Sequence, residues 1–388
     1  MRIHQLTLDG LLSFGPDTPP IDLQSLNVLI GPNGSGKSNL VEAIGLLRAS
    51  PRDLSEQVKD AGGVADWLWK GAPKREASIE AIIENDAKPD MPLRHFFSFT
   101  EHGMRFEMTR ERIENKDPYP GHDHPYFIYK MEDGHPRLKE HEASDEGRPL
   151  PRESINPEES ILSQVRDPER YPLLTSLSNF YKQIRIYREW SFGRNTPPRK
   201  PQKADMASTA LAETFENLAL VLNAMRPQAK QTLLDALQVL YPGIDDFNVQ
   251  IQAGWVQLYL EEGRFSIPAT RLSDGTLRYL CLLAVLCHPD PPPVVCIEEP
   301  ELGLHPDVLP ELAKLFLTAS ARTQLIVTTH SDILVDALTE VPESVLVCEK
   351  RQGQTHVHRL DADELSRWLE KYRLGQLWLK GHFGGTRW

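Results

Sequence analysis

The sequence predicts an α/β fold that combines a parallel sheet, an antiparallel β layer and a helical lobe. Mostly apolar runs at residues 26–30, 294–297 and 325–329 alternate with helical patterns. Such runs are typical of parallel strands that helices cover on both faces. The helices are expected at residues 39–47, from Gly275 onward, and at 308–319.

The antiparallel layer is expected in the first half of the chain. Residues 2–8 alternate between apolar and polar side chains, which is the period of a half-buried strand, and residues 77–84 form another expected strand. Two hairpins follow, the first with strands at 96–100 and 105–109 and the second with a strand at 126–131.

Between residues 173 and 240 the pattern becomes helical, apart from an expected loop at 193–201 that is rich in proline and glycine. Apolar side chains recur there at helical spacing, namely Leu211, Phe215, Leu218, Leu222 and Met225. The sequence has no internal repeat and no sustained heptad pattern.

The composition is that of a globular protein, with 40% hydrophobic and 25% charged residues. A net charge of −12 argues against a generally basic nucleic-acid-binding surface, although local basic patches stay open. No apolar stretch reaches the length of a membrane span. The four scattered cysteines are interpreted as buried thiols in a reducing compartment, so we expect a cytoplasmic protein with no membrane partner.

Residues 31–38 fit the phosphate-binding pattern G-x-x-x-x-G-K-[ST] between an expected strand and an expected helix. Glycines let successive N–H groups point at phosphate oxygens, and the helix N-terminus adds positive potential. Lys37 is expected to reach the outer phosphates, and the Ser38 hydroxyl to ligate magnesium. The pattern predicts a nucleoside triphosphate site at Asn33, Gly34, Ser35, Gly36, Lys37 and Ser38.

Carboxylates follow the apolar run at 294–297. Glu298 and Glu299 come directly after it, where ligands bind in open α/β sheets. Because side chains alternate along a strand, we expect Glu298 to hold hydrated magnesium and Glu299 to activate the attacking water. His330, which follows the run at 325–329, is expected to donate to the γ-phosphate and hold the same water.

Ser273, Asp274, Gly275 and Thr276 precede an apolar helical run, and we expect them to cap that helix. One interpretation is that these residues only cap the helix and have no further role. The functional interpretation is that this helix N-terminus is presented outward and binds a phosphate that belongs to another subunit.

In this order the motifs resemble the ATP-binding-cassette ATPases, in particular the SMC/RecF-like heads and the prokaryotic AAA-type ATPases of the overcoming-lysogenization-defect group. The sequence at residues 31–39 is similar to the phosphate-loop sequence of that branch, and this similarity adds Asn39 to the expected nucleotide site. Residues 272–276 are similar to the signature Leu-Ser-Gly-Gly-Gln, with Asp274 and Thr276 as departures. Glu298 stands where the family usually has aspartate.

The resemblance implies a P-loop NTPase of the ABC/SMC-head type that hydrolyses ATP with Mg²⁺. Two copies would enclose two ATP molecules, each bound by the phosphate loop of one copy and by Ser273 and Gly275 of the other. Residues 300–306 would contact the second copy, and Gln164 would link nucleotide and metal to the helical lobe. The implied catalytic residues are Glu299 and His330, and the implied metal ligands are Ser38, Gln164 and Glu298.

Three segments are expected from these motifs: a first ATPase lobe at 1–165, a helical lobe at 166–250 and a second ATPase lobe at 251–388. Between Gln164 and Ser273 lie 273 − 164 = 109 residues, which suffice for a small lobe but not for long coiled-coil arms. After His330 only 388 − 330 = 58 residues remain, too few for the nuclease domain appended in the resembling group.

The expected function is an ATP-dependent switch that works with a separate nuclease-like effector in genome maintenance or phage defence. A RecF-like DNA-repair ATPase that binds DNA directly is the main alternative, and a transporter motor subunit is less favoured. Two local features stay open. The histidines between His95 and His141 fit a metal site or loop and hairpin edges, and the basic loop with Arg194, Arg199, Lys200 and Lys203 fits a phosphate contact or a solvated surface.

Overall fold

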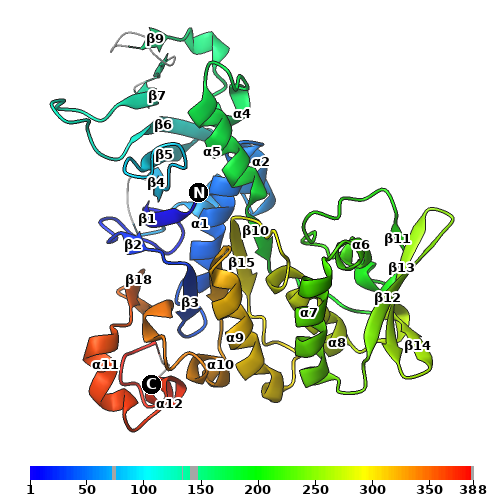
Figure 1. Cartoon of the computed structure of the whole chain (residues 1–388). Helices are drawn as coiled ribbons and strands as arrows, with labels where there is room; N and C mark the ends of the chain where they lie inside the picture. The colour runs from blue at the N-terminus through cyan, green and yellow to red at the C-terminus, as the bar shows by residue number, and fades with distance from the viewer. Residues whose placement is uncertain (72–75, 133, 140–146, 386–388) are drawn as a thin grey trace. The chain divides into compact units, whose positions relative to one another are not determined.

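The computed structural model describes residues 1–71, 76–132, 134–139 and 147–385. The chain forms two compact units that are interleaved along the sequence (Figure 1). Unit 1 contains Met1–Gln24, Gly31–Ile184 and Cys348–His358, and unit 2 contains Ser25–Ile30, Arg185–Val347 and Arg359–Trp388.

An antiparallel sheet dominates unit 1, with strand order β2-β1-β4-β5-β6-β7-β8-β9. Buried and exposed side chains alternate along its strands, as in β1, where Leu6 and Leu8 are fully buried. The predicted antiparallel layer is therefore confirmed, and both hairpins are present. The strands of the first hairpin are longer than predicted, and the strand predicted at 126–131 is shifted by one residue. The strands are β1 Ile3–Asp9, β2 Ile21–Asp22, β4 Glu76–Ile83, β5 Leu93–His102, β6 Arg105–Asn115, β7 Phe127–Glu132, β8 His135–Leu138 and β9 Arg148–Pro149.

In the described part of unit 1 the helices are α1 Lys37–Ala49, α2 Leu54–Asp60, α3 Val64–Trp67, α4 Ile161–Gln164 and α5 Pro172–Gln183. Helix α5 contacts α1 and α4. It buries Leu174, Leu177 and Tyr181, whose spacing of three and four residues forms one helical face. Two-residue β9 and four-residue α4 show how little regular structure connects the sheet to α5.

The central sheet of unit 2 is parallel, with order β10-β15-β16-β3-β17, and β18 follows β17 at its edge. Strands β3, β15 and β16 carry the three mostly apolar runs, and their apolar side chains are buried on both faces. The predicted α/β class is confirmed. The strands are β3 Leu26–Ile30, β10 Arg185–Tyr187, β15 Val294–Glu298, β16 Gln324–Thr328, β17 Val345–Arg351 and β18 Gln354–Arg359, of which Cys348–His358 belong to unit 1.

A smaller antiparallel sheet and most of the helices complete unit 2. In Figure 1, α7 and α8 lie between the central strands and this small sheet. The small sheet contains β11 Gln202–Lys203, β12 Asp246–Gln252, β13 Trp255–Glu262 and β14 Phe265–Pro268. The helices are α6 Leu218–Asn223, α7 Pro227–Leu240, α8 Asp274–Leu286, α9 Leu309–Ser320, α10 Asp332–Asp336, α11 Ala362–Leu369 and α12 Leu374–Leu379.

The predicted helical pattern at 173–240 is only partly correct. Helices α5, α6 and α7 are present, but β10 was missed, and Leu211 and Phe215 lie outside any helix. Phe215 has a positive φ of 61° and stacks on Trp190 with ring centroids 5.2 Å apart. The helical spacing of these side chains thus reflects burial in an aromatic cluster and not a helix face.

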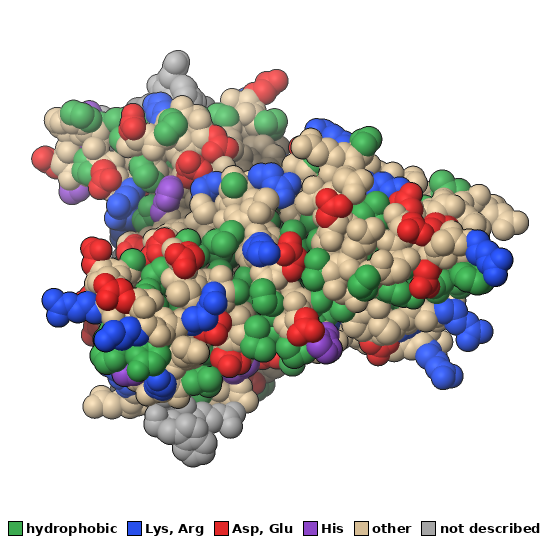
Figure 2. Space-filling view, turned by 60° about the horizontal axis from the view of Figure 1, so that its bottom comes forward, with side chains coloured by type: hydrophobic (Ala, Val, Ile, Leu, Met, Phe, Trp, Pro, Cys, Tyr) green, Lys and Arg blue, Asp and Glu red, His purple; other side chains and the backbone are tan. Residues whose placement is uncertain are grey.

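The surface has no continuous basic stripe on the face that Figure 2 displays. Acidic and basic side chains are interspersed there, with apolar side chains between them. On that face the charge distribution agrees with the expectation, from the net charge of −12, that the surface is not generally basic. None of the described helices is long and apolar enough to cross a membrane.

Candidate functional site

The phosphate loop lies in unit 1, directly after β3 and before α1. The Nζ atom of Lys37 donates hydrogen bonds to the carbonyl oxygens of Gly31 at 2.8 Å and Pro32 at 3.1 Å. The Lys37 side chain therefore lies along the loop in which it is expected to bind phosphate. Its side chain is buried, so its charge acts within the loop and not at the open surface.

Close packing explains two of the loop glycines. A Cβ atom on Gly36 would lie 2.1 Å from Oγ1 of Thr355, and one on Gly31 would lie 2.2 Å from the carbonyl oxygen of Cys348. Gly36 also has a φ of 103°, which a side chain disfavours. Gly31 and Gly36 thus permit the close approach of a backbone carbonyl of β17 and a side chain of β18 to the loop.

A hydroxyl and amide network holds the loop. Ser13 Oγ and Thr355 Oγ1 lie 2.6 Å apart, Asn39 Nδ2 donates to Ser13 Oγ at 2.6 Å, and Thr355 Oγ1 donates to the carbonyl of Ser35 at 2.9 Å. The structure therefore places Asn39 as a support of the loop. Sequence reasoning missed Ser13 and Thr355, because short polar residues far from the motif carry no pattern of their own.

The loop is suited to an anionic ligand. The buried Oγ of Ser35 has no hydrogen-bond partner within the described part of the chain. Gly36 is the N-cap of helix α1 and offers no side-chain cap, and no acidic residue lies in the first turn of this fully described helix. Asn33, Gly34 and Ser38 are exposed around it. A helix N-terminus of this kind is a favourable position for phosphate oxygens.

Gln164 also lies in unit 1, as the last residue of α4. Its Oε1 accepts from the backbone N of Asn156 at 2.8 Å, and its Nε2 donates to the carbonyl of Glu159 at 3.0 Å. The turn that it closes is anchored by buried Glu111, whose Oε2 accepts from the backbone N of Ile161 at 2.9 Å. The carboxamide is thus engaged locally, and its role toward nucleotide or metal stays a prediction.

The acidic residues lie in unit 2. Strand β15 ends at Glu298, and Glu299 follows with a positive φ of 46°. The backbone N of Glu299 donates to the carbonyl of Thr328 at 3.0 Å. Glu299 therefore lies beyond the strand, and a left-handed backbone conformation sets the direction of its side chain. Strand alternation, from which we expected Glu298 and Glu299 to point in different directions, is not the reason for its position. Such backbone strain costs roughly 1–3 kcal/mol and is concentrated at functional positions.

Glu299 and His330 are neighbours. Oε1 of Glu299 and Nε2 of His330 lie 3.5 Å apart, and both side chains are about one third exposed, at 38% and 34%. The pair combines a carboxylate and an imidazole at the carboxyl edge of β15 and β16. Together they can hold a water molecule and accept its proton.

Glu301 was missed as a site residue and was assigned only to the segment that contacts a second copy. Its Oε1 accepts from Oγ1 of Thr329 and from the backbone N of His330, both at 2.7 Å. Burial raises the pKa of Glu301, although these hydrogen bonds act in the opposite direction. Glu301 thus positions the loop that carries His330.

Glu298 is held by residues from the segment after β10. Nη2 of Arg188 lies 3.2 Å from Oε1 of Glu298, and Nε1 of Trp190 donates to the Glu298 carbonyl at 2.7 Å. A carboxylate accepts at two oxygens, so Glu298 can share an arginine and a hydrated cation. The guanidinium of Arg278 lies 5.0 Å from the centre of the Trp190 ring and donates to the carbonyl of Leu302. Arg278 therefore links α8 to the acidic loop.

Ser273 caps α8, as expected. Its Oγ accepts from the backbone N of Thr276 at 3.0 Å, and its side chain is exposed. A Cβ on Gly275 would lie 2.8 Å from the carbonyl of Gly303, so glycine permits the approach of that loop. Asp274, which departs from the signature, forms an ion pair with buried Arg199. This pairing offsets the negative charge of Asp274 at the start of the helix.

The histidines and cysteines noted in the sequence form no metal site in the described part of the chain. No group of three or more metal-ligating side chains occurs among residues 1–71, 76–132, 134–139 and 147–385, and His141 lies outside these ranges. All four cysteines are buried, as expected. Burial raises the pKa of Cys348 to about 12, so this thiol stays protonated at neutral pH.

The fold is similar to that of solved SMC heads. It matches the crystal structure of an SmcHead bound to the C-winged helix domain of ScpA, with a TM-score of 0.58 and 14% identity over 94% of this chain and 99% of that chain. It also matches the Smc head domain from Pyrococcus furiosus bound to the C-terminal domain of ScpA, with a TM-score of 0.56 and 14% identity over 95% and 99%. At this identity the similarity shows the fold.

Two chromosome partition proteins Smc match in sequence over a short region. The protein from Gloeobacter violaceus is 36% identical over 87 residues, which are 22% of this chain and 7% of that protein. The protein from Cereibacter sphaeroides is 32% identical over 89 residues, 22% of this chain and 8% of that protein. The matches thus cover less than a tenth of the length of these relatives.

A family model covers most of the chain. The model described as "AAA domain, putative AbiEii toxin, Type IV TA system" matches residues 26–336, which include the phosphate loop, the acidic strand and His330. The chain therefore belongs to this family of AAA-domain ATPases, and its fold is that of SMC heads.

Proposed function

We propose that this ATPase is a switch in which two copies close around two ATP molecules and thereby control a separate effector protein. ATP binding favours the closed dimer, and hydrolysis lets it open. In this account each ATP is held by the phosphate loop and acids of one copy and by Ser273 and Gly275 of the other. The biological setting that we propose is prokaryotic genome maintenance or phage defence.

Within one copy, the proposed roles follow the chemistry of the side chains. Lys37 and the loop N–H groups, from Asn33 to Asn39, bind the phosphates. Ser38 and Glu298 supply oxygen ligands of the type that Mg²⁺ prefers, and Gln164 is the third proposed ligand. When bound, Mg²⁺ would neutralise charge on the phosphates.

Glu299 and His330 are the proposed catalytic residues. Glu299 orients the attacking water and accepts its proton, and His330 holds the same water and donates to the γ-phosphate. The 3.5 Å separation between Oε1 of Glu299 and Nε2 of His330 supports a shared water. Glu301 is proposed to position this pair through its hydrogen bond to the His330 backbone.

The observation that best supports the proposed dimer is the exposed N-terminal end of α8. Eleven of its thirteen residues are buried, whereas Ser273 and Asp274 at its start are exposed. The neighbouring carboxylate of Asp274 is paired with Arg199. An exposed helix N-terminus with a neutralised acid favours a phosphate that arrives from outside the copy, which supports a second copy as its source.

Control of an effector is supported by the comparisons at the level of family and fold. The family description refers to a toxin of a type IV toxin–antitoxin system. Two solved heads of this fold are described as bound to a domain of ScpA, so a head of this shape can bind a partner. We propose a partner of another kind for this chain, a nuclease-like effector.

The experiment that tests the proposal measures molar mass by light scattering, with and without ATP and Mg²⁺. The Glu299→Gln variant keeps the size and hydrogen bonding of the side chain but removes the base, so it should accumulate as an ATP-bound dimer. The double variant Glu299→Gln/Ser273→Arg should stay a monomer that still binds ATP. A Glu299→Gln protein that remains a monomer with ATP would show that the proposed dimer is wrong.

A further inference from the structure

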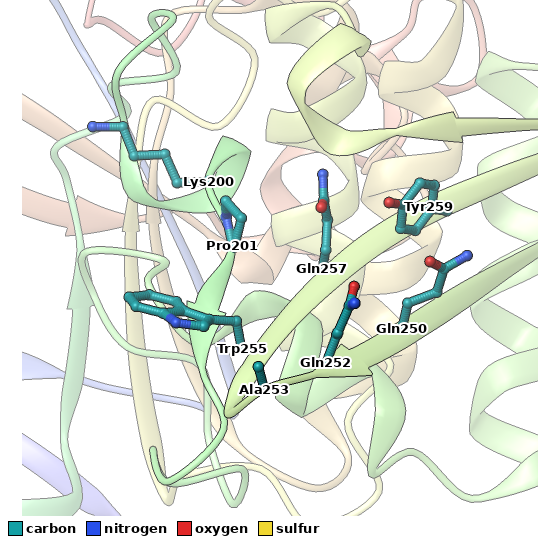
Figure 3. A pocket seen from close by; sticks show the side chains of 8 residues that line it. All are labelled: Lys200, Pro201, Gln250, Gln252, Ala253, Trp255, Gln257 and Tyr259. Atoms are coloured by element: carbon teal, nitrogen blue, oxygen red, sulfur yellow. The ribbon is translucent and has the colours of Figure 1, made fainter.

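The small sheet of unit 2 has a pocket on one face that the ATPase site does not use (Figure 3). Its volume is about 540 Å³, within the range of roughly 300–1,000 Å³ that is usual for ligand sites. The pocket is lined by Lys200, Pro201, Gln250, Gln252, Ala253, Trp255, Gln257 and Tyr259.

Strand register explains why these side chains share a face. Gln250 pairs with Gln257 and Gln252 with Trp255 across β12 and β13, and paired residues point to the same side of an antiparallel sheet. On β13 the alternating residues Val256 and Leu258 are buried in the core of unit 2. The polar and aromatic residues that line the pocket thus lie on the outer face of the hairpin, and β13 packs its inner face against the core.

The composition of this face is unusual for a solvated sheet. Trp255 is 50% exposed, although a large aromatic side chain gains free energy when it is covered. Three carboxamides surround the rings, and each offers both donors and an acceptor. Figure 3 shows Gln252 and Gln257 between Trp255 on one side and Tyr259 on the other.

Charge restricts the ligand. The lining residues include one lysine and no carboxylate, in a chain whose net charge is −12. Lys203 pairs with Trp255 in the register of β11 and β13, so a second exposed cation lies on the same face. In Figure 3 Lys200 lies on the Trp255 side of the pocket. These two lysines favour a ligand with negative charge along its length.

The spacing of the rings restricts the ligand further. Trp255 and Tyr259 are four residues apart on β13, so about 13 Å separates them along the strand. A single planar group held between two rings needs only about 7 Å, twice the usual contact distance. The two rings therefore serve separate planar groups, which a mononucleotide does not supply.

We propose that this face binds single-stranded nucleic acid. Trp255 and Tyr259 stack on two bases, the carboxamides of Gln250, Gln252 and Gln257 bond to base edges, and Lys200 and Lys203 contact phosphates. Stacking on aromatic rings together with phosphate contacts to lysines is a common way to hold unpaired strands. This site goes beyond the ATP-dependent switch and does not depend on it.

Only part of the basic loop noted in the sequence joins this face. Arg199 is buried and donates to the carbonyl oxygens of Phe192 at 2.7 Å and Leu272 at 2.6 Å. It is therefore a structural support that fixes the chain next to Lys200. The exposed lysines on either side of Pro201 and Gln202 remain as the phosphate contacts.

The test uses the full chain and a fluorescein-labelled oligonucleotide of mixed sequence, about 16 nucleotides long, as DNA and as RNA. Fluorescence anisotropy at low salt should show binding. Trp255→Ala and Tyr259→Ala should each weaken it by about five-fold or more, because each variant removes one stacking ring. Ile251→Ala is the matched control, since Ile251 is exposed on the same hairpin but does not line the pocket. It should leave the affinity unchanged.

Two further measurements separate this ligand from others. The double variant Lys200→Ala/Lys203→Ala should lower the slope of log affinity against log salt by about 0.7 for each phosphate that the lysines no longer neutralise. Duplex DNA of the same sequence should compete poorly, because its bases are not available for stacking. The ATPase rate of Trp255→Ala should equal that of the unchanged chain, which shows that the fold is intact.

The proposal is overturned if neither labelled strand binds, or if Trp255→Ala and Ile251→Ala bind alike. It is also overturned if duplex DNA competes as well as the single strand. Binding of a polypeptide or a polysaccharide by the Trp255 face, with no binding of either oligonucleotide, would assign the pocket to a different class of ligand.

Discussion

The carboxylate of Glu301 accepts a hydrogen bond from the backbone N–H of His330, with 2.7 Å between Oε1 and N. The same oxygen accepts from the Thr329 hydroxyl at 2.7 Å. One partly buried side chain thus joins the loop after β15 to the loop after β16. The position of His330 depends on these hydrogen bonds to Glu301 as well as on strand β16, which precedes it.

The Glu301 carboxylate should make stability depend on pH. Burial raises its pKa above the usual 4.5, so the folded chain binds a proton there more readily than the unfolded chain does. Its contribution to stability therefore falls as pH rises through the raised pKa, and the ionised form is a net cost above it. Glu301→Gln keeps an acceptor without the charge. We expect a higher unfolding temperature at pH 8 and a smaller gain near pH 4.5, by calorimetry.

Glu301→Ala is the contrasting variant. It removes the acceptor of two hydrogen bonds, and we expect a loss of about 1–3 kcal/mol and a slower ATPase, because the His330 loop is released. If Glu301→Gln were less stable than the unchanged chain at pH 8, the carboxylate would be favourable in its ionised form, contrary to this account.

Thr355 should support nucleotide binding without touching the nucleotide. Thr355→Val keeps the shape of the side chain but removes the hydroxyl that donates to the Ser35 carbonyl and meets Ser13. We expect ATP affinity to fall by about five-fold, the equivalent of one hydrogen bond. Lys37→Ala should lose ATP binding altogether. Titration of a fluorescent ATP analogue measures both, and equal affinity for Thr355→Val and the unchanged chain would contradict the role of this network.

Glu111 should anchor the turn that carries Gln164. Its buried carboxylate accepts from Ile161 N and from Ser160 Oγ, and it lies 3.3 Å from Nε2 of His95. Glu111→Ala would leave several buried groups unpaired, so we expect a loss of about 3 kcal/mol in unfolding free energy by urea titration. Glu107→Ala, on the same strand but partly exposed, should change it by less than about 0.5 kcal/mol. Similar effects of the two changes would rule out the anchor.

Arg188 should compete with magnesium for Glu298. Its guanidinium lies 3.2 Å from Oε1 of the carboxylate that we assign to the metal side. Because two cations close together repel each other, Arg188→Ala should lower the Mg²⁺ concentration needed for half-maximal ATP hydrolysis. Arg194→Ala, an exposed arginine on the same segment, is the control. A higher Mg²⁺ requirement in Arg188→Ala would indicate that Arg188 helps to hold the nucleotide.

The sequence predicted those parts of the fold whose signal is contiguous. Strands β3, β15 and β16 are short, mostly apolar runs, and the phosphate loop and the cap at Ser273 are short motifs. Glu298, Glu299 and His330 could be proposed because each follows such a run. The structure brings Glu299 and His330 together, as that reasoning required.

The missed features depend on contacts between distant segments. Trp190 and Phe215 stack although neither lies in a helix or a strand, and the burial of Phe215 in this cluster made an irregular segment look helical. Thr355 supports a loop more than 300 positions earlier in the chain, and its hydroxyl has no signature. Arg199 looked like a surface cation, but its partner Asp274 was identifiable only as a departure from a motif.

The central claim is that each ATP site is built from two copies, and mixing two defective variants tests it most directly. Lys37→Ala lacks the phosphate-loop contribution, and Ser273→Arg lacks the contribution from the second copy, so each alone should be inactive. A mixed dimer contains one intact site of two, and the ATPase rate of the mixture should rise toward half that of the unchanged chain. Lys37→Ala mixed with Ser38→Ala is the control and should stay inactive, because both defects affect the same half of the site. A Lys37→Ala and Ser273→Arg mixture that is no more active than its separate components would contradict the shared site.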